Sequence, residues 1–247
     1  MIDRFVFTAM TGAKHAMGQL ATTSHNMANL QTPGFREMLS TFRAVPIDGA
    51  SADSRAFVVD STPGADWTAG SITPTGNPLD VAIQDQGLFA IRRADGQEAY
   101  TRAGKFHLDP QGYLVTTGGH KVLNEQGHPI QIPEASEEIL IQPNGSVRIK
   151  VSGQMMDSPL TRLKLVNPMP HTLERQGDGL FTSVEDLLPA EEVRVLQGSL
   201  EGSNVNAAQA MVQMIAQNRL FDLNIRLVQV AEQNSKTAGT LMSLSRA

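Results

Sequence analysis

The 247-residue chain is long enough for one large domain or two modest ones, each able to bury a core of its own. Its formal net charge is −5, and its 20 Lys and Arg residues form no basic cluster. A nucleic-acid-binding surface and a polybasic membrane anchor both need such a cluster, so we expect neither kind of partner. The chain contains no Cys, which excludes disulfides, thiolate metal sites and cysteine nucleophiles.

The first 30 residues predict a long helix. They contain few helix breakers, and apolar or small side chains recur at steps of four and three residues. The stretch lacks the basic segment and apolar core of a secretory signal peptide, and no run approaches the ~18 apolar residues of a membrane span. We therefore expect no cleaved signal peptide and no membrane insertion. The seam residues are Ile2, Val6, Ala9, Ala13, Ala16, Leu20, Thr23, Met27 and Leu30.

The middle of the chain predicts β structure. Short apolar or alternating runs such as "LFAIRR" (88–93) and "SVRIKV" (146–151) are separated by turn sequences, and "RADGQ" (93–97) predicts a hairpin. These runs indicate a mostly antiparallel β-rich domain over residues 79–200. Residues 36–78 are rich in Ser, Thr, Ala, Gly and Pro with one strand-like run, "RAFVVD", so we expect an extended connector there.

Residues 201–247 return to a helical pattern. Ser203, Asn204 and Asn206 are candidate N-cap residues at its start. The seam of this helix contains Leu220, Leu223, Leu227, Val230, Asn234, Thr237, Leu241 and Leu244. Two heptad-patterned helices at opposite ends of one chain predict an α+β fold in which helix 1–35 and helix 201–247 pair as a coiled coil.

The outer faces of these helices are unusually poor in charge. Residues 204–247 contain six charged residues but ten Asn or Gln. Amides and hydroxyls can be hydrogen-bonded across an interface, whereas an unpaired buried charge costs several kcal/mol, on the order of 3–5. We therefore interpret both seams as contacts to further subunits. The alternative is an ordinary two-helix bundle that packs on the β domain.

The stretch "NMANLQTPGF" (26–35) ends the first helix. Pro33 disfavours helical backbone at Thr32, and Gly34 tolerates the left-handed backbone of a tight turn. A helix stop alone does not explain Asn26, Asn29 and Phe35. We therefore interpret the stretch as a packing site, in which the asparagines bond freed carbonyls or a neighbour's backbone and Phe35 fills the joint.

The sequence contains no enzyme motif. It lacks Gly-x-Ser-x-Gly, a phosphate-binding loop, Gly-x-Gly-x-x-Gly, His-Glu-x-x-His and an EF-hand loop. Its six His residues have no metal-ligand spacing on one helix face. We expect a protein that is not an enzyme, with no catalytic residues, no metal ligands and no cofactor.

Four blocks resemble the flagellar axial proteins, which include rod, hook and hook-associated subunits. The blocks are "TSHNMANLQTPGFRE" (23–37), "NPLDVAIQDQGLFAI" (77–91), "YTRAGKFHLDPQGYLVTTGGHKVL" (100–123) and "LEGSNVNAAQAMVQMI" (200–215). They occur in order and cover most of the chain. The short connector "FRAVPIDG" (42–49) followed by "STPGAD" (61–66) is similar to proximal-rod subunits, with distal-rod and hook subunits as the alternative within the family.

The resemblance implies a structural subunit that assembles with itself and other rod subunits into a helical tube, which crosses the periplasm and transmits torque. It also implies unprocessed export through the flagellar type III apparatus, and terminal helices that line the inner tube. His25 and Met27 depart from the family's more frequent Asn and Leu, so a titratable group could make assembly pH-sensitive. From the residues alone, a β-rich binding module oligomerised by a terminal coiled coil stays open.

Overall fold

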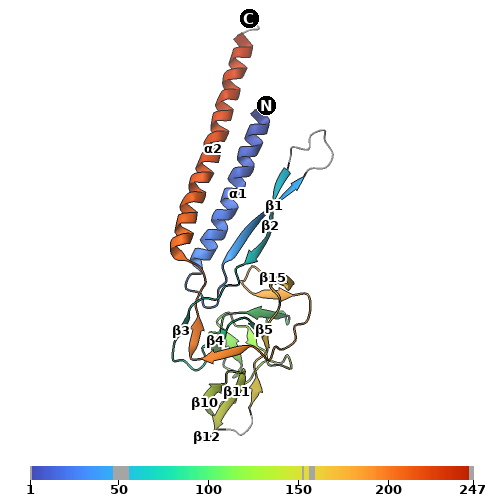
Figure 1. Ribbon diagram of the computed structural model, residues 1–247, viewed down its shortest axis with the longest axis vertical. Helices are drawn as coiled ribbons and strands as arrows, with labels where there is room; N and C mark the ends of the chain where they lie inside the picture. Colours follow the sequence, from blue (N-terminus) through green and yellow to red (C-terminus); the bar gives the residue numbers. More distant parts are fainter. Residues whose placement is uncertain (1, 47–55, 152, 156–158, 245–247) are drawn as a thin grey trace. The chain divides into compact units, whose positions relative to one another are not determined.

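The computed structural model describes residues 2–46, 56–151, 153–155 and 159–244 (Figure 1). The chain forms two compact units. The helical unit comprises Met1–Ala28, Met38–Gly64 and Asn206–Ala247, and the β unit comprises Asn29–Glu37 and Ala65–Val205. The chain therefore crosses between the units four times, after residues 28, 37, 64 and 205. The predicted α+β class is confirmed.

Two helices and a two-stranded sheet make up the helical unit. Helix α1 (Ile2–Ala28) lies alongside α2 (Ala207–Leu244), and strand β1 (Met38–Pro46) contacts α1 and pairs with β2 (Ala56–Ala65) (Figure 1). The helices approach closely: a Cβ added to Gly12 would lie 2.7 Å from Asn224 Oδ1. Neither described helix is apolar over a stretch long enough to cross a membrane.

The β unit consists of short antiparallel strands. An eight-stranded sheet has the order β15-β16-β6-β5-β9-β8-β7 with β14 paired to β5, and a four-stranded sheet combines β10, β11, β12 and β13. Strands β17–β4 and β18–β3 form two further pairs. The bounds are β3 Ile72–Pro74, β4 Val81–Gln84, β5 Leu88–Arg92, β6 Glu98–Thr101, β7 Phe106–Leu108, β8 Leu114–Thr116, β9 Lys121–Val122, β10 Ser136–Ile141, β11 Ser146–Val151, β12 Gln154–Met155, β13 Thr161–Arg162, β14 Leu165–Val166, β15 Leu173–Arg175, β16 Phe181–Ser183, β17 Arg194–Gln197 and β18 Ser199–Glu201, with a 3-10 turn at Pro170–Thr172.

The predicted hairpin over "RADGQ" is confirmed. It joins β5 to β6, which pair antiparallel with Arg92 opposite Glu98. The turn is closed by the Arg93 N–H, which donates to the Gln97 carbonyl at 2.9 Å. Asp95 Oδ1 accepts the Gln97 N–H at 2.9 Å, which is the usual role of Asp in such a turn.

Strand β5 is buried on both faces. Its alternate residues Phe89 and Ile91 belong to one core cluster, while Leu88 and Ala90 belong to a second. Successive side chains of a strand point to opposite faces, so a continuous apolar run is needed where both faces are covered. This explains why "LFAI" shows no polar alternation.

The segment expected as an extended connector, residues 36–78, contains strands β1, β2 and β3. Only the run "RAFVVD", at the start of β2, was strand-like in the sequence. A two-stranded ribbon is held by its backbone ladder and does not require an apolar alternation in each strand. Strand β1, "MLSTFRAVP", therefore gave no clear signal.

Close backbone packing at Gly104 yields a stability prediction. A Cβ added there would lie 1.6 Å from the Val81 carbonyl oxygen, and the Gly104 carbonyl accepts the Val81 N–H at 2.9 Å. Overpacking of a protein interior typically costs about 1–3 kcal/mol. We expect Gly104→Ala to lower the free energy of unfolding by at least this amount. Urea denaturation of the full chain measures this difference.

Gly177→Ala is the matched control, because a Cβ there would meet no heavy atom within 4 Å. We expect this variant to change the free energy of unfolding by less than about 1 kcal/mol. Equal stability of the two variants would contradict the packing described for Gly104.

Candidate functional site

Three residues that are far apart in the sequence form a buried ionic triad in the β unit. The Arg36 Nη1 donates to Glu201 Oε1 at 2.8 Å, and the Arg102 Nε donates to Glu201 Oε2. The side chains of both arginines are 2% exposed and that of Glu201 is 1% exposed. Each residue lies in one of the sequence blocks that suggested the family: 23–37, 100–123 and 200–215. The triad is thus the point at which these blocks meet.

Arg102 also fixes the turn between β4 and β5. Its Nη1 donates to the Gly87 carbonyl at 2.7 Å, and its Nη2 donates to the carbonyls of Ile83, at 3.0 Å, and Asp85. Asp85 has φ +56°, in the left-handed region that a residue with a Cβ seldom adopts. Such backbone costs on the order of 1 kcal/mol or more and persists only where its surroundings impose it. Arg102 supplies that constraint.

The triad contains two positive charges for one negative charge. Burial lowers the pKa of the Arg36 guanidinium and the nearby Arg102 lowers it further, while Glu201 opposes both effects. Arginine nevertheless stays protonated in proteins. Glu201 is therefore the essential counter-charge for two cations that water cannot solvate.

Hydrogen bonds around the triad join the segments of the β unit that lead into and out of the helical unit. The Gly34 N–H donates to the Glu201 carbonyl at 2.8 Å, and the Gly70 N–H donates to Glu201 Oε1 at 2.9 Å. Arg36 Nη1 donates to the Thr68 carbonyl at 2.7 Å. Segments 29–37, 65–70 and 201–205 are therefore held to one another.

Asn204 makes a second set of bonds among the same segments. Its Oδ1 accepts the Glu37 N–H at 2.7 Å, and its Nδ2 donates to the Asp66 carbonyl at 3.0 Å. The Asp66 N–H in turn donates to the Glu37 carbonyl at 2.9 Å. Asn204 thus bridges two backbone segments and is not the cap of α2.

The turn at 29–35 needs glycine for two reasons. Gly34 has φ +68°, and a Cβ there would lie 2.3 Å from the Arg102 carbonyl carbon. Thr32 closes the turn that begins at Asn29, since its N–H donates to the Asn29 carbonyl at 3.2 Å and its hydroxyl donates to Asn29 Oδ1 at 3.0 Å. Pro33 is half-buried within it.

Phe35 fills the interior next to this turn. Its side chain is buried, and the Arg175 guanidinium lies over its ring, 4.7 Å from the centroid. Arg175 Nη1 also donates to the Arg36 carbonyl at 2.6 Å. Cation–π contact and hydrogen bond together hold the backbone beside the triad in place.

Asn26 bonds to strand β1 inside the helical unit. Its Nδ2 donates to the Met38 carbonyl at 2.9 Å, and its Oδ1 accepts the Met38 N–H at 2.8 Å. The side-chain amide therefore pairs with both backbone groups of Met38, as a neighbouring strand would.

Asn206, the third candidate N-cap, caps α2: its Oδ1 accepts the Gln209 N–H at 3.1 Å. Ser203 Oγ accepts the Val205 N–H at 3.3 Å, outside the helix.

The two predicted seams differ in their surroundings. On α1, Ala9, Ala13 and Ala16 are buried, while Val6, Leu20 and Met27 are half-buried. Leu30 is half-buried in the turn that follows. On α2 the seam is exposed, by 48% at Leu220, 57% at Leu223, 42% at Leu227 and 52% at Val230. The side chains of Ile2, Leu241 and Leu244 lie outside the described residues.

Helix α2 uses a different line of residues against α1. Gln217 Nε2 donates to Thr23 Oγ1 at 3.0 Å, and Asn224 lies next to Gly12. Ala210 and Ala231 are the buried apolar positions that the structure describes on α2. Met214, Phe221 and Val228 are half-buried on α2 as well, so the less exposed line of α2 mixes small, amide and apolar side chains, and it leaves the leucine line open to solvent.

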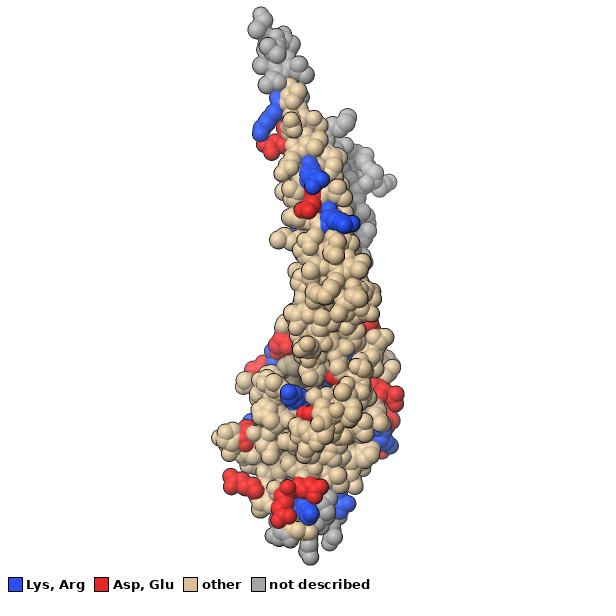
Figure 2. Space-filling model, turned by 90° about the vertical axis from the view of Figure 1, so that its left-hand side faces the viewer, with Lys and Arg blue, Asp and Glu red and all other residues tan. Residues whose placement is uncertain are grey.

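The open face of the helices is poor in charge. Figure 2 shows mostly uncharged residues over the helices on the face turned to the viewer. Described apolar side chains that are at least half exposed on α2 include Met211, Val212, Ile215 and Leu223. His25 is exposed on α1.

The triad residues were not predicted as functional residues. Arg36, Arg102 and Glu201 each stand inside a recognised block, and a charged residue amid apolar and small neighbours was the available signal. Their pairing could not be read from the sequence, because Arg102 and Glu201 are 99 residues apart.

Loss of the Glu201 charge tests the triad. Glu201→Gln keeps the shape of the side chain but leaves two buried guanidinium groups without a counter-ion. We expect the free energy of unfolding to fall by about 3–5 kcal/mol, as when one partner of a buried ion pair is removed. Glu174→Gln, at an exposed position in the same unit, should change it by less than about 0.5 kcal/mol. A Glu201→Gln variant as stable as this control would refute the role assigned to Glu201.

Loss of the Asn26 amide tests the bond to β1. Asn26→Ala removes both partners of Met38, so we expect a stability loss of about 1–3 kcal/mol. We also expect faster hydrogen–deuterium exchange at the Met38 amide, measured by mass spectrometry. Asn218→Ala, at an exposed position of α2, should leave that exchange rate unchanged. Unchanged exchange in Asn26→Ala would show that Met38 is protected by another group.

Two family models match parts of the chain. Residues 82–149 match the flagellar hook protein FlgE/F/G D1 domain, and residues 196–241 match the C-terminal region of flagellar basal body rod FlgEFG proteins. The first match lies within the β unit, and the second begins at β17 and runs through most of α2. The first matched region thus contains Arg102, and the second contains Glu201 and Leu220, Leu223 and Leu227 of α2.

Individual relatives match over nearly the whole chain. The chain is 42% identical to the flagellar basal-body rod protein FlgF of Escherichia coli (strain K12), over 99% of this chain and 100% of the relative. It is 40% identical to FlgF of Salmonella typhimurium over the same shares. It is 30% identical to the flagellar basal-body rod protein FlgG of Caulobacter vibrioides, over 96% of this chain and 98% of the relative.

Proposed function

The chain belongs to the family of flagellar hook and basal-body rod proteins that includes FlgF, and we infer from this that it is a structural, non-enzymatic subunit of the flagellar basal-body rod. The observation that carries the inference is the 42% identity to a rod protein over 99% of this chain. Because the match spans both units, it covers the helices as well as the β unit. The protein functions in the basal body by assembling with other rod and hook subunits.

Within the rod we propose a proximal position. The two relatives that are 40–42% identical are both FlgF, whereas four FlgG relatives are 28–30% identical and two further FlgF relatives are 26–28% identical. The short connector points in the same direction. A distal-rod or hook subunit has no comparable support.

We propose that the terminal helices make the contacts between subunits and pair as a coiled coil. Support comes from the leucine line of α2, which is apolar, nearly free of charge and open to solvent in the single chain. In a helical array one patch binds a different patch on the next copy, so an unpaired face is expected on each isolated subunit. Further subunits would cover this face at little desolvation cost, since its polar groups are amides and hydroxyls.

We also propose that the subunit reaches the rod through the flagellar type III apparatus without a cleaved signal peptide. The match to flagellar basal-body rod proteins over 99% of this chain supports this export route. The partners would then be copies of this chain, the other rod subunits and the export apparatus. Nucleic acid and direct membrane insertion are not part of the proposed function.

The leucine line gives a direct test. We expect the triple replacement of Leu220, Leu223 and Leu227 by Asp to abolish swimming, because three charges would have to be desolvated in the assembled rod. The β unit should stay folded, since these residues lie on α2. Soft-agar motility, with circular dichroism of the purified variant, measures both outcomes.

The control adds the same three charges elsewhere by replacing Gln111, Gln126 and Gln131, exposed residues of the β unit, with Asp. Swimming of this control shows that added charge alone does not block export or assembly. Normal swimming of the leucine variant would refute the helix-contact proposal.

A further inference from the structure

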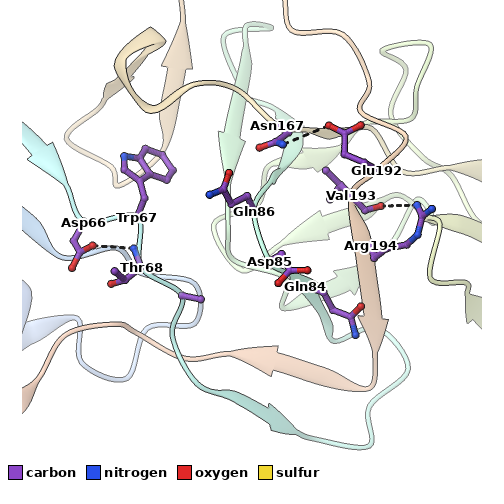
Figure 3. Close-up of a pocket in the computed structure, with 11 residues that line it drawn as sticks. Asp66, Trp67, Thr68, Gln84, Asp85, Gln86, Asn167, Glu192, Val193 and Arg194 are labelled. Atoms are coloured by element: carbon purple, nitrogen blue, oxygen red, sulfur yellow. Dashed lines mark hydrogen bonds between the residues drawn. The ribbon is translucent and has the colours of Figure 1, made fainter.

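A hollow of about 800 Å³ in the β unit is lined by several polar side chains that already have partners within the chain (Figure 3). Asp66 Oδ1 accepts the Thr68 N–H at 2.9 Å. Asn167 Nδ2 donates to Glu192 Oε1 at 3.5 Å, and Arg194 donates to backbone carbonyls of its own segment. The side chains of the β4–β5 turn that also line the hollow are exposed to water. The hollow therefore requires no partner, whereas the helices present apolar side chains that water solvates poorly.

Helix α1 has an exposed line of residues of its own, here called the outer line. It contains Phe7, Met10, Lys14 and Met17, and the three apolar members are exposed by 55%, 59% and 62%. Steps of three, four and three residues separate its members, which is the spacing of a helix-contact seam. The line continues through exposed small residues at Ala21, Ser24 and Ala28.

The two helices run in opposite directions within the helical unit (Figure 1). Gly12, in the first half of α1, lies next to Asn224 of α2. Thr23, near the end of α1, is bonded by Gln217, which comes earlier in α2. Residue numbers therefore fall along α2 as they rise along α1.

The outer line of α1 and the leucine line of α2 face opposite sides of this helix pair. Met10, Lys14 and Met17 each directly follow a buried alanine of α1. Each leucine of the leucine line directly precedes a half-buried residue on the less exposed line of α2. One residue turns a helix by about 100°. One step forward on α1 and one step back on an antiparallel helix are rotations in the same sense, so the two lines point away from opposite faces of the pair.

The spacing of the two lines is complementary. From Phe7 to Met17 the steps are three, four and three residues, and the steps are the same from Val230 back to Leu220. Copies that point the same way along an array present α1 of one copy antiparallel to α2 of the next. Such a contact places Met17 level with Leu220, Lys14 with Leu223, Met10 with Leu227 and Phe7 with Val230.

Charge favours this register. Lys14 is the cation within the outer line, and Asp222 directly precedes Leu223, so the two charges lie level with each other. Both side chains are exposed, and the ion pair described on α2 lies farther along the helix and involves neither residue. Arg219 and Arg226 lie about one turn to either side of Asp222. Opposite charges beside a helix seam determine which partner binds and in which register.

A shift by one heptad loses the opposite charge. It would place Lys14 level with Ala216 or with Val230. The residues that precede these two positions, Ile215 and Gln229, are uncharged. The carboxylate at Asp222 therefore distinguishes one register from the others that the spacing allows.

We propose that the leucine line of α2 binds the outer line of α1 from a second copy of this chain, in the register that sets Lys14 beside Asp222. This inference rests on the rod function proposed above and names the partner of the leucine line. Because the two lines face opposite sides of the helix pair, each copy offers one line to each of two neighbours, and the contact repeats without closing on two copies. A two-fold dimer would instead set one line against itself and leave the other line exposed.

The absence of cysteine from the chain permits a disulfide test. Met17→Cys is combined with Leu220→Cys in the full chain, which replaces the chromosomal copy. Basal bodies are purified under reducing conditions and then oxidised, and non-reducing gels are probed with an antibody to the subunit. We expect a ladder of linked copies, dimers and larger, because each copy carries both partner positions. The two thiols of one copy face opposite sides of the helix pair and cannot reach each other.

Control variants check the direction and the register of the contact. Each single cysteine variant should give at least tenfold less dimer, since a head-to-tail contact brings no second thiol to it. Met10→Cys combined with Leu220→Cys should also give at least tenfold less, because Met10 lies about 10 Å along the axis from Met17, beyond the reach of a disulfide. Met10→Cys combined with Leu227→Cys should give the same ladder as the first pair, and it tests the same register if the first pair prevents assembly.

A charge exchange tests the pairing of Lys14 with Asp222. Lys14→Glu or Asp222→Lys alone should reduce the yield of linked copies several-fold, and the two together should restore it. Dimers from a single cysteine variant, linkage only to a different axial subunit, no ladder from either in-register pair, or no rescue by the double exchange would overturn the inference. Absence of the wild-type subunit from purified basal bodies would instead refute the rod function.

Discussion

The carboxylate of Glu201 lies between two arginines that have almost no access to water, and the architecture of the β unit depends on this arrangement. Each Glu201 oxygen bonds a different guanidinium, and Arg102 uses its remaining N–H groups on the β4–β5 turn. The same charge thus stabilises the segment after α1 and the turn before β5. Neither arginine can be hydrated. A network that lacks one of these bonds would therefore leave a buried charge without its partner, at a high cost in free energy.

The helices show the opposite use of polarity. The buried and half-buried side chains of α2 mix alanines and amides with Met214, Phe221 and Val228, and the leucines of α2 are exposed. In a soluble monomer an exposed leucine line would be a liability, because large apolar patches promote association. In a subunit of a rod the same line is available for neighbours. The buried ionic triad therefore lies inside the β unit, and the surfaces for assembly are of a kind that loses water cheaply.

Local sequence patterns predicted the two helices and the hairpin, but they could not predict contacts between residues far apart in the sequence. The heptad spacing placed the helices within a few residues of Ile2–Ala28 and Ala207–Leu244, and "RADGQ" marked the hairpin between β5 and β6. Strand β1 was missed because its ladder with β2 leaves no apolar alternation. At the site, the stop at Pro33 and Gly34 was readable from backbone chemistry alone. The triad was not, since nothing local in the sequence links Arg36 or Arg102 to Glu201.

The separation of the triad along the chain has a kinetic consequence. Arg102 and Glu201 are 99 residues apart, and Arg36 precedes both. Contacts this distant require closure of long loops, and folds rich in them form slowly. A chain that emerges N-terminus first therefore carries Arg36 and Arg102 as hydrated cations until β18 follows. Only then can both guanidinium groups be buried against Glu201. The β unit therefore completes its fold late, when little more than α2 remains to emerge.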